Sequence, residues 1–113
     1  MTRHPNVPEI DVHEAKRRVE AGDRFIDVRE PDEFEEARIP GAVLMPLSEF
    51  MDRYREELEA DLAVVVHCRS GARSARIVQF LLQQGYDAVN VEGGILAWEE
   101  EGLPVERGGE PQA

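Results

Sequence analysis

The single cysteine of the chain, Cys68, stands at the end of an apolar run. It is followed by a short polar loop made of Arg69, Ser70, Gly71, Ala72 and Arg73. The pattern predicts a buried strand at 62–67 and an amphipathic helix at 74–84. A thiol between the two faces backbone N–H groups and the positive end of the helix dipole. Such a thiol is easier to ionise, and the thiolate is the nucleophilic form.

The loop after Cys68 has residue types suited to binding an anion. Two arginines at a strand-to-helix turn contribute little to packing but can bind a negative group. Gly71 allows the backbone to curl, so that successive N–H groups point inward and form a nest. A lone cysteine after valines is more often a small buried hydrophobe. These neighbours are what favour a reactive cysteine here.

Short strands alternate with helices along the chain. Strands are expected at Ile10, 24–28, 42–45, 62–67 and 88–91. Helices are expected from Asp11 as N-cap to Gly22, at 33–37 opened by Pro31, from Ser48 as cap to 58, at 74–84 ended by Gly85, and at 95–101. The alternation predicts an α/β fold, with a mostly parallel five-stranded central sheet and helices on both faces. Ligands of such sheets bind outside the carboxyl ends of the strands, which is where Cys68 is expected.

Length and charge limit the organisation and the partners. The 113 residues predict one domain over 10–106, with a lead-in at 1–9 and a flexible tail at 107–113. A net charge of −11 argues against nucleic acid or an anionic membrane as partner. A small anionic substrate would need a local cluster of positive charge, which screening over about 8–10 Å makes feasible.

Cysteine and histidine usage bears on compartment and metal binding. One cysteine cannot form an intramolecular disulfide, and no stretch reads as a signal peptide or a membrane span, so we expect a cytoplasmic protein. One cysteine and three scattered histidines offer no metal-ligand spacing, so no metal is expected.

Four ordered motifs are similar to those of single-domain rhodanese-like sulfurtransferases. They are, in chain order, 26–30 (Ile-Asp-Val-Arg-Glu), 33–42 (Glu-Phe, then Ile-Pro-Gly-Ala), 68–73 (the cysteine loop) and 92–105 (Glu-Gly-Gly-Ile-Leu-Ala-Trp, then Gly-Leu-Pro-Val). Together they extend over about residues 10–106. The family's usual Gly-His before Ile-Pro-Gly-Ala is Ala37-Arg38 here, and one interpretation is that Arg38 adds positive charge near the site.

The resemblance implies sulfane-sulfur transfer with Cys68 as the catalytic nucleophile. Its thiolate would take the outer sulfur of a small anionic donor such as thiosulfate, expel sulfite and become a persulfide. Cyanide, a thiol or a protein acceptor would then remove that sulfur. The amides of the loop at 69–73 would stabilise the sulfur anion, and Arg69 and Arg73 would attract the donor. No metal or organic cofactor is needed.

Three further residues near the motifs are assigned supporting roles. Asp27 and Arg29 are expected to form an ion pair that braces the loop, in preference to direct substrate contact. The side chain of His67 should point to the opposite face from Cys68, as a structural histidine with its hydrogen bonds satisfied.

Two other functions compete with sulfur transfer. Cysteine phosphatases and arsenate reductases also cradle an oxyanion with a cysteine loop and an arginine. Their pattern has five residues between cysteine and arginine, whereas four lie between Cys68 and Arg73, and the shorter ring suits a single sulfur atom better. The other competitor is a non-catalytic sulfur carrier or protein-binding module, although rhodanese-like domains without catalysis usually lack the cysteine.

Overall fold

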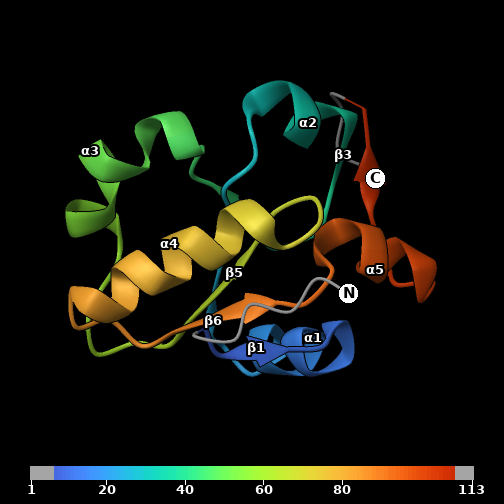
Figure 1. Cartoon of the computed structure of the whole chain (residues 1–113). Helices are drawn as coiled ribbons and strands as arrows, with labels where there is room; N and C mark the ends of the chain where they lie inside the picture. Colours follow the sequence, from blue (N-terminus) through green and yellow to red (C-terminus); the bar gives the residue numbers. More distant parts are fainter. Residues whose placement is uncertain (1–6, 109–113) are drawn as a thin grey trace.

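The computed structural model describes residues 7–108 of the chain and has a five-stranded sheet at its centre (Figure 1). The strands are β1 (Glu9–Ile10), β2 (Arg24–Asp27), β4 (Val43–Leu44), β5 (Val64–His67) and β6 (Ala88–Val91). Their order is β1-β6-β5-β2-β4, and every neighbouring pair is parallel. The predicted parallel α/β sheet is therefore confirmed. Cys68 follows β5, the central strand.

Helices cover both faces of this sheet, as predicted. One face carries α3 (Leu47–Glu57) and α4 (Ala72–Gln83), and the other carries α1 (Val12–Glu20) and α5 (Gly94–Glu100). A further helix, α2 (Pro31–Glu36), follows the carboxyl end of β2. On the face covered by α3 and α4, Phe50 and Leu81 pack against Val64 and Val66 of β5. On the face covered by α1 and α5, Trp98 packs in a separate hydrophobic core.

The alternation of side chains along β5 separates Cys68 from His67. Val64 and Val66 face α3 and α4, whereas Val65 faces α1 and α5. In a strand successive side chains point to opposite faces. Cys68 accordingly joins the core beneath α3 and α4, and His67 points the other way, beside Phe25. The predicted orientation of His67 is confirmed.

The start of α3 differs from the prediction. The helix begins at Leu47 with Pro46 in the cap position, so Ser48 is not the cap. Proline suits the start of a helix because the N–H that it lacks would have no partner within the helix. Ser48 lies instead in the first turn, where its Oγ donates to Glu30 at 2.9 Å.

A small second sheet was not predicted. It pairs β3 (Ala37–Arg38) with β7 (Glu106–Arg107) in antiparallel fashion. The helix expected to reach residue 37 ends at Glu36 because Ala37 is already extended, with φ −160° and ψ 138°. The Nη1 of Arg38 donates to the carbonyl of Gly108 at 2.7 Å, and its Nε lies 3.5 Å from Glu106. Arg38 thus ties β7 to β3 and does not add its charge to the cysteine loop.

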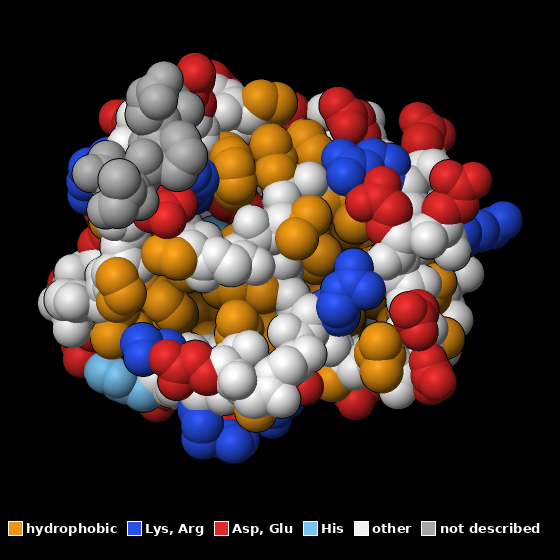
Figure 2. Space-filling view, turned by 180° about the vertical axis from the view of Figure 1, so that it is seen from behind, with side chains coloured by type: hydrophobic (Ala, Val, Ile, Leu, Met, Phe, Trp, Pro, Cys, Tyr) orange, Lys and Arg blue, Asp and Glu red, His pale blue; other side chains and the backbone are white. Residues whose placement is uncertain are grey.

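The outer limits of the domain remain a prediction. The expected boundary after residue 106 falls inside β7, while residues 1–6 of the expected lead-in and 109–113 of the expected tail lie outside the described residues. Within 7–108, no helix has the length and apolar character that crossing a bilayer requires. Acidic and basic side chains intermingle around apolar groups on the face shown in Figure 2.

Candidate active site

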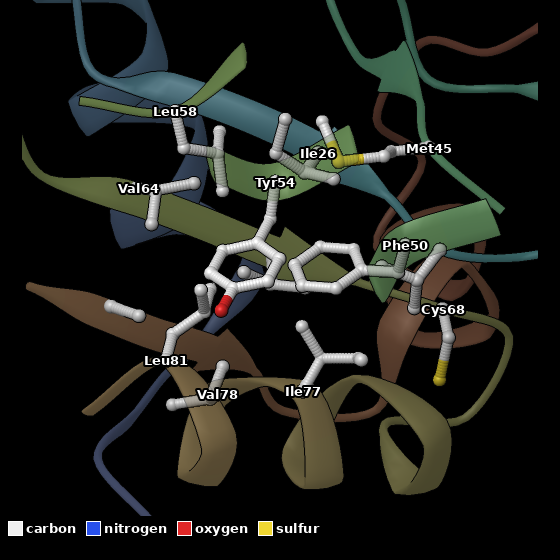
Figure 3. Close-up of a cluster of buried hydrophobic side chains, with 13 residues drawn as sticks. Ile26, Met45, Phe50, Tyr54, Leu58, Val64, Cys68, Ile77, Val78 and Leu81 are labelled. Carbon is white, nitrogen blue, oxygen red and sulfur yellow. The ribbon is translucent and has the colours of Figure 1, made fainter. Parts of the chain in front are cut away.

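Two backbone N–H groups and the hydroxyl of Ser74 lie against the sulfur of Cys68. Its side chain is almost fully buried, with 1% of the residue exposed. The Sγ accepts from the N–H of Gly71 at 3.1 Å and from the N–H of Ser74 at 3.4 Å, and the Ser74 Oγ lies 3.3 Å away. Figure 3 shows the sulfur at one end of the core cluster, beside the first turn of α4. The inward-pointing N–H groups expected from the loop sequence are therefore in place.

Two glycines allow the loop to take this shape. Gly71 caps α4 in the left-handed region, at φ +103°, where a side chain would be strained. Gly94, at φ +59°, opens α5 so close to the loop that a Cβ would overlap the carbonyl oxygens of Cys68 and Arg69. The N–H groups of Ile95 and Leu96 bind those carbonyls at 3.0 and 3.2 Å. The carbonyls of Cys68 and Arg69 thus face α5.

The expected ion pair between Asp27 and Arg29 is present at the carboxyl end of β2. Both residues are buried, and the guanidinium binds the carboxylate at 2.7 and 3.0 Å. Arg29 also donates to the carbonyls of Glu33 at 3.4 Å and Ala37 at 2.7 Å. The pair therefore fixes the α2–β3 segment directly, and Asp27 also lies beside His67, the residue before Cys68.

Arg73 is held by a carboxylate that the sequence reasoning did not assign to the site. Its Nη1 and Nη2 donate to the two oxygens of Glu33 at 2.8 and 2.9 Å. Hydrogen bonding to Arg73 lowers the pKa of Glu33 to about 2, and Glu33 raises the pKa of Arg73. Both groups are charged at neutral pH, so Glu33 offsets much of the positive charge expected from Arg73. Glu33 belongs to the Glu-Phe motif, which was the available signal.

Arg69 has a different setting from Arg73. It is exposed and lines a hollow of about 190 Å³ beside the loop. The hollow lies against α5, and its other charged lining residues are Arg29, Glu33, Glu36, Glu99 and Arg107. Ser70 is half-buried and Ala72 is exposed, and the side chain of neither surrounds the sulfur. Among the predicted loop residues, Gly71 alone has a hydrogen bond to Sγ.

His67 is only half satisfied, which corrects the expectation of a fully bonded histidine. Its Nδ1 donates to the carbonyl of Cys68 at 3.2 Å, because a carbonyl can only accept. Its Nε2 has no hydrogen-bond partner within residues 7–108 and lies 3.5 Å from the carboxylate of Asp27. Burial lowers the pKa of His67, which favours the neutral ring.

A buried polar chain behind the sulfur was missed by the sequence analysis. Ser74 Oγ lies 2.5 Å from Oδ1 of Asn90, and the Asn90 amide donates to the carbonyl of Gly71 and to the Glu9 carboxylate at 3.0 and 2.9 Å. Ser74 and Asn90 are both fully buried. The one available signal was a polar residue, Asn90, inside the apolar strand β6.

Comparison with known proteins identifies the family to which this fold belongs. The sequence model of the rhodanese-like domain matches residues 11–101. A sulfurtransferase of Allochromatium vinosum is 43% identical over 82 residues, which cover 72% of this chain and 76% of that protein. Thiosulfate sulfurtransferase GlpE of Vibrio cholerae is 33% identical over 99 residues, covering 86% and 92% of the two chains.

A solved structure of a rhodanese-related protein has the same overall fold. The rhodanese-related protein of Thermoplasma volcanium superposes with a TM-score of 0.81 at 38% identity, covering 88% of this chain and 97% of that one. The matches extend over most of the chain and include the cysteine loop at the end of the central strand. The chain belongs to the rhodanese-like domain family, and its sulfurtransferase relatives support a general role in sulfur transfer.

Proposed function

We propose that this chain moves sulfane sulfur from a small anionic donor such as thiosulfate to cyanide or a thiol, through a persulfide on Cys68. The observation that carries the proposal is the pair of backbone N–H groups, of Gly71 and Ser74, directed at a buried sulfur. Fixed donors of this kind stabilise an anion without having to reorganise during the reaction. A sulfur that gains and loses negative charge in each cycle fits such a site.

In the first half of the reaction, the Cys68 thiolate attacks the outer sulfur of thiosulfate. A bond forms between the two sulfurs, the donor's own S–S bond breaks, and sulfite leaves with the electron pair. The thiol proton passes to solvent before the attack. The exposed guanidinium of Arg69 attracts the dianionic donor locally, against a net charge of −11 on the whole chain.

In the second half, the carbon of cyanide or the sulfur of a thiolate attacks the outer sulfur of the persulfide. That bond forms as the bond to Cys68 Sγ breaks, and Sγ leaves as a thiolate held by the same amides. The two halves make a two-step covalent mechanism, for which ping-pong kinetics are expected.

The setting of Arg73 favours sulfur over phosphorus as the transferred atom. In a cysteine phosphatase the loop arginine has to bind the phosphoryl oxygens, for which guanidinium is well suited. Here Nη1 and Nη2 of Arg73 each donate a hydrogen bond to the Glu33 carboxylate, which offsets the positive charge that a phosphoryl group would need. The ring from Cys68 to Arg73 is also one residue shorter than the phosphatase pattern.

Intact-mass measurement after incubation with thiosulfate tests the proposal. We expect the gain of one sulfur atom, its removal by cyanide with formation of thiocyanate, and neither event in the Cys68→Ser variant. Hydrolysis of an aryl phosphate, lost in Cys68→Ser and without any sulfur gain, would instead identify a phosphatase. An unchanged mass with no hydrolysis would contradict catalysis and favour a protein-binding role.

A further inference from the structure

The amide of Asn90 has one orientation that satisfies its surroundings. Its Nδ2 lies 3.0 Å from the carbonyl of Gly71 and 2.9 Å from the carboxylate of Glu9. Both partners can only accept, so they require the two N–H bonds of the amide. A flipped amide would place Oδ1 against two oxygens. The oxygen of Asn90 therefore faces Ser74.

This orientation decides where the hydroxyl hydrogen of Ser74 points. Oδ1 of Asn90 can only accept, and it lies 2.5 Å from Ser74 Oγ, so the single hydroxyl hydrogen is directed at Asn90. Ser74 Oγ then presents a lone pair to Cys68 Sγ, 3.3 Å away. A lone pair accepts a hydrogen bond from an S–H group but repels a thiolate. The hydroxyl of Ser74 thus opposes the two N–H donors that favour the anion.

We infer that Asn90 is a positioning residue that makes Ser74 an acceptor for the Cys68 S–H, so that this hydroxyl favours the thiol over the thiolate. The inference rests on the proposed function for the role of Cys68 as nucleophile. It deepens that function, because Asn90 and Ser74 set the pH range in which the first half-reaction begins. Nucleophilic attack requires loss of this proton, and the hydrogen bond to Ser74 raises the cost of that loss.

Charged groups around Cys68 come from every element packed against the loop. They are Arg69 and Arg73 of the loop and α4, Asp27 and Arg29 after β2, Glu33 of α2, Glu9 of β1, His67 of β5 and Glu99 of α5. Replacing Ser74 or Asn90 with alanine alters none of these charges. A change in thiol ionisation in those variants therefore reports the hydroxyl and its orientation.

The test is a pH titration of the ultraviolet absorbance of the thiolate, which a single cysteine makes unambiguous. The Cys68→Ser variant supplies the baseline. For Ser74→Ala we expect the titration midpoint to fall by about 0.4–1 pH unit, the equivalent of one net hydrogen bond to the thiol. An unchanged or raised midpoint would overturn the inference, because it would mean that the hydroxyl does not favour the thiol.

The role of Asn90 is tested by a double-variant cycle. Asn90→Ala releases the hydroxyl, which can then turn to donate to the thiolate, so the midpoint should again fall. In the Ser74→Ala background the same change should shift nothing further, and an equal shift there would contradict a role through Ser74. Ser48→Ala removes a serine hydroxyl that binds Glu30 and forms no hydrogen bond with Cys68, so it serves as the matched control and should leave the midpoint unchanged.

The result of this titration does not depend on the result of the test of the proposed function. The titration requires no sulfur donor, so a chain that never gains sulfur still reports the effect of Ser74 and Asn90. If Ser74→Ala does lower the midpoint, persulfide formation from thiosulfate below that midpoint should be about threefold to tenfold faster than in the unmodified protein.

Discussion

The carboxyl ends of β2 and β5 lie side by side in the sheet, yet they use polar groups in opposite ways. After β2, the charges of Asp27 and Arg29 neutralise each other, and the remaining Arg29 donors bind carbonyls of the α2–β3 segment. After β5, the backbone N–H groups of Gly71 and Ser74 converge on the buried sulfur of Cys68. The comparison teaches that charged side chains here hold the surrounding segments in place, while backbone amides and one hydroxyl contact the sulfur of Cys68.

The largest expected effect comes from breaking the pair at the end of β2. Arg29→Leu leaves the fully buried Asp27 carboxylate without its counter-ion, so the free energy of unfolding should fall by about 3–5 kcal/mol. Urea denaturation at neutral pH measures this loss. Arg17→Leu removes an arginine from an exposed pair with Glu14 and should have no measurable effect. Equal effects of the two variants would show that the buried pair is not a structural element.

The second expected effect concerns the close approach of α5 to the cysteine loop. A Cβ at Gly94 would overlap the carbonyls of Cys68 and Arg69, so Gly94→Ala should displace the loop and slow persulfide formation by about tenfold or more. Gly85 has a similarly positive φ of +90° but open space around it, so Gly85→Ala controls for backbone strain. Similar rates of persulfide formation in the two variants would mean that α5 does not set the shape of the loop.

The third effect concerns Arg69, the exposed arginine of the cysteine loop. Arg69→Ala removes the cation that attracts the donor, so we expect KM for thiosulfate to rise about fivefold and to depend less on salt. Steady-state kinetics at two ionic strengths provide the measurement. Arg76→Ala removes an exposed arginine from the same helix end without touching the hollow, and should change neither value. The same rise in both variants would reduce the role of Arg69 to net charge.

The smallest effect is a pH dependence of stability caused by Glu33. Arg73 lowers the pKa of this carboxyl from 4.5 to about 2 in the folded chain. A lowered folded pKa contributes stability that is complete above 4.5 and is lost as the pH falls toward 2. Glu33→Gln should therefore be less stable than the unmodified protein at pH 7, and the difference should close on acidification. Urea midpoints across that range would contradict the assignment if the gap stayed constant.

The central sheet and its helices were predictable because their signals are local and strong. The valines at 64–66 indicate the strand β5, and Asp11 with Glu14 three residues later indicates the start of α1. In the structure the side chain of Asp11 accepts from the N–H of Glu14 at 2.8 Å. The pairing of β3 with β7 has no such signal, because each strand has two residues and their partner lies about seventy positions away. Helix α3 was misjudged at its start because Pro46 was not considered as a cap.

The part of the candidate site that depends on backbone conformation was predictable from the sequence. A strand, a glycine and a helix are sufficient to direct N–H groups at Cys68, and the motif supplied all three. The partners of the side chains were not predictable, because they depend on which residues the fold brings together. From the sequence, Arg73 is interpreted as a cation that binds a substrate, whereas in the structure α2 places Glu33 against it. From the sequence, Asn90 is only a polar residue in an apolar strand, whereas in the structure it binds Ser74 and Gly71.

The hydrogen bonds between α5 and the cysteine loop have a consequence for how firmly that loop is held in place. The carbonyls of Cys68 and Arg69 serve as acceptors for the first N–H groups of α5, so turning either peptide would leave one of those N–H groups without a partner. The loop that carries Cys68 is thus anchored to a helix on the opposite face of the sheet from α4. The positions of the N–H groups around the sulfur therefore depend on both faces of the sheet, through α4 directly and through α5 by these carbonyls.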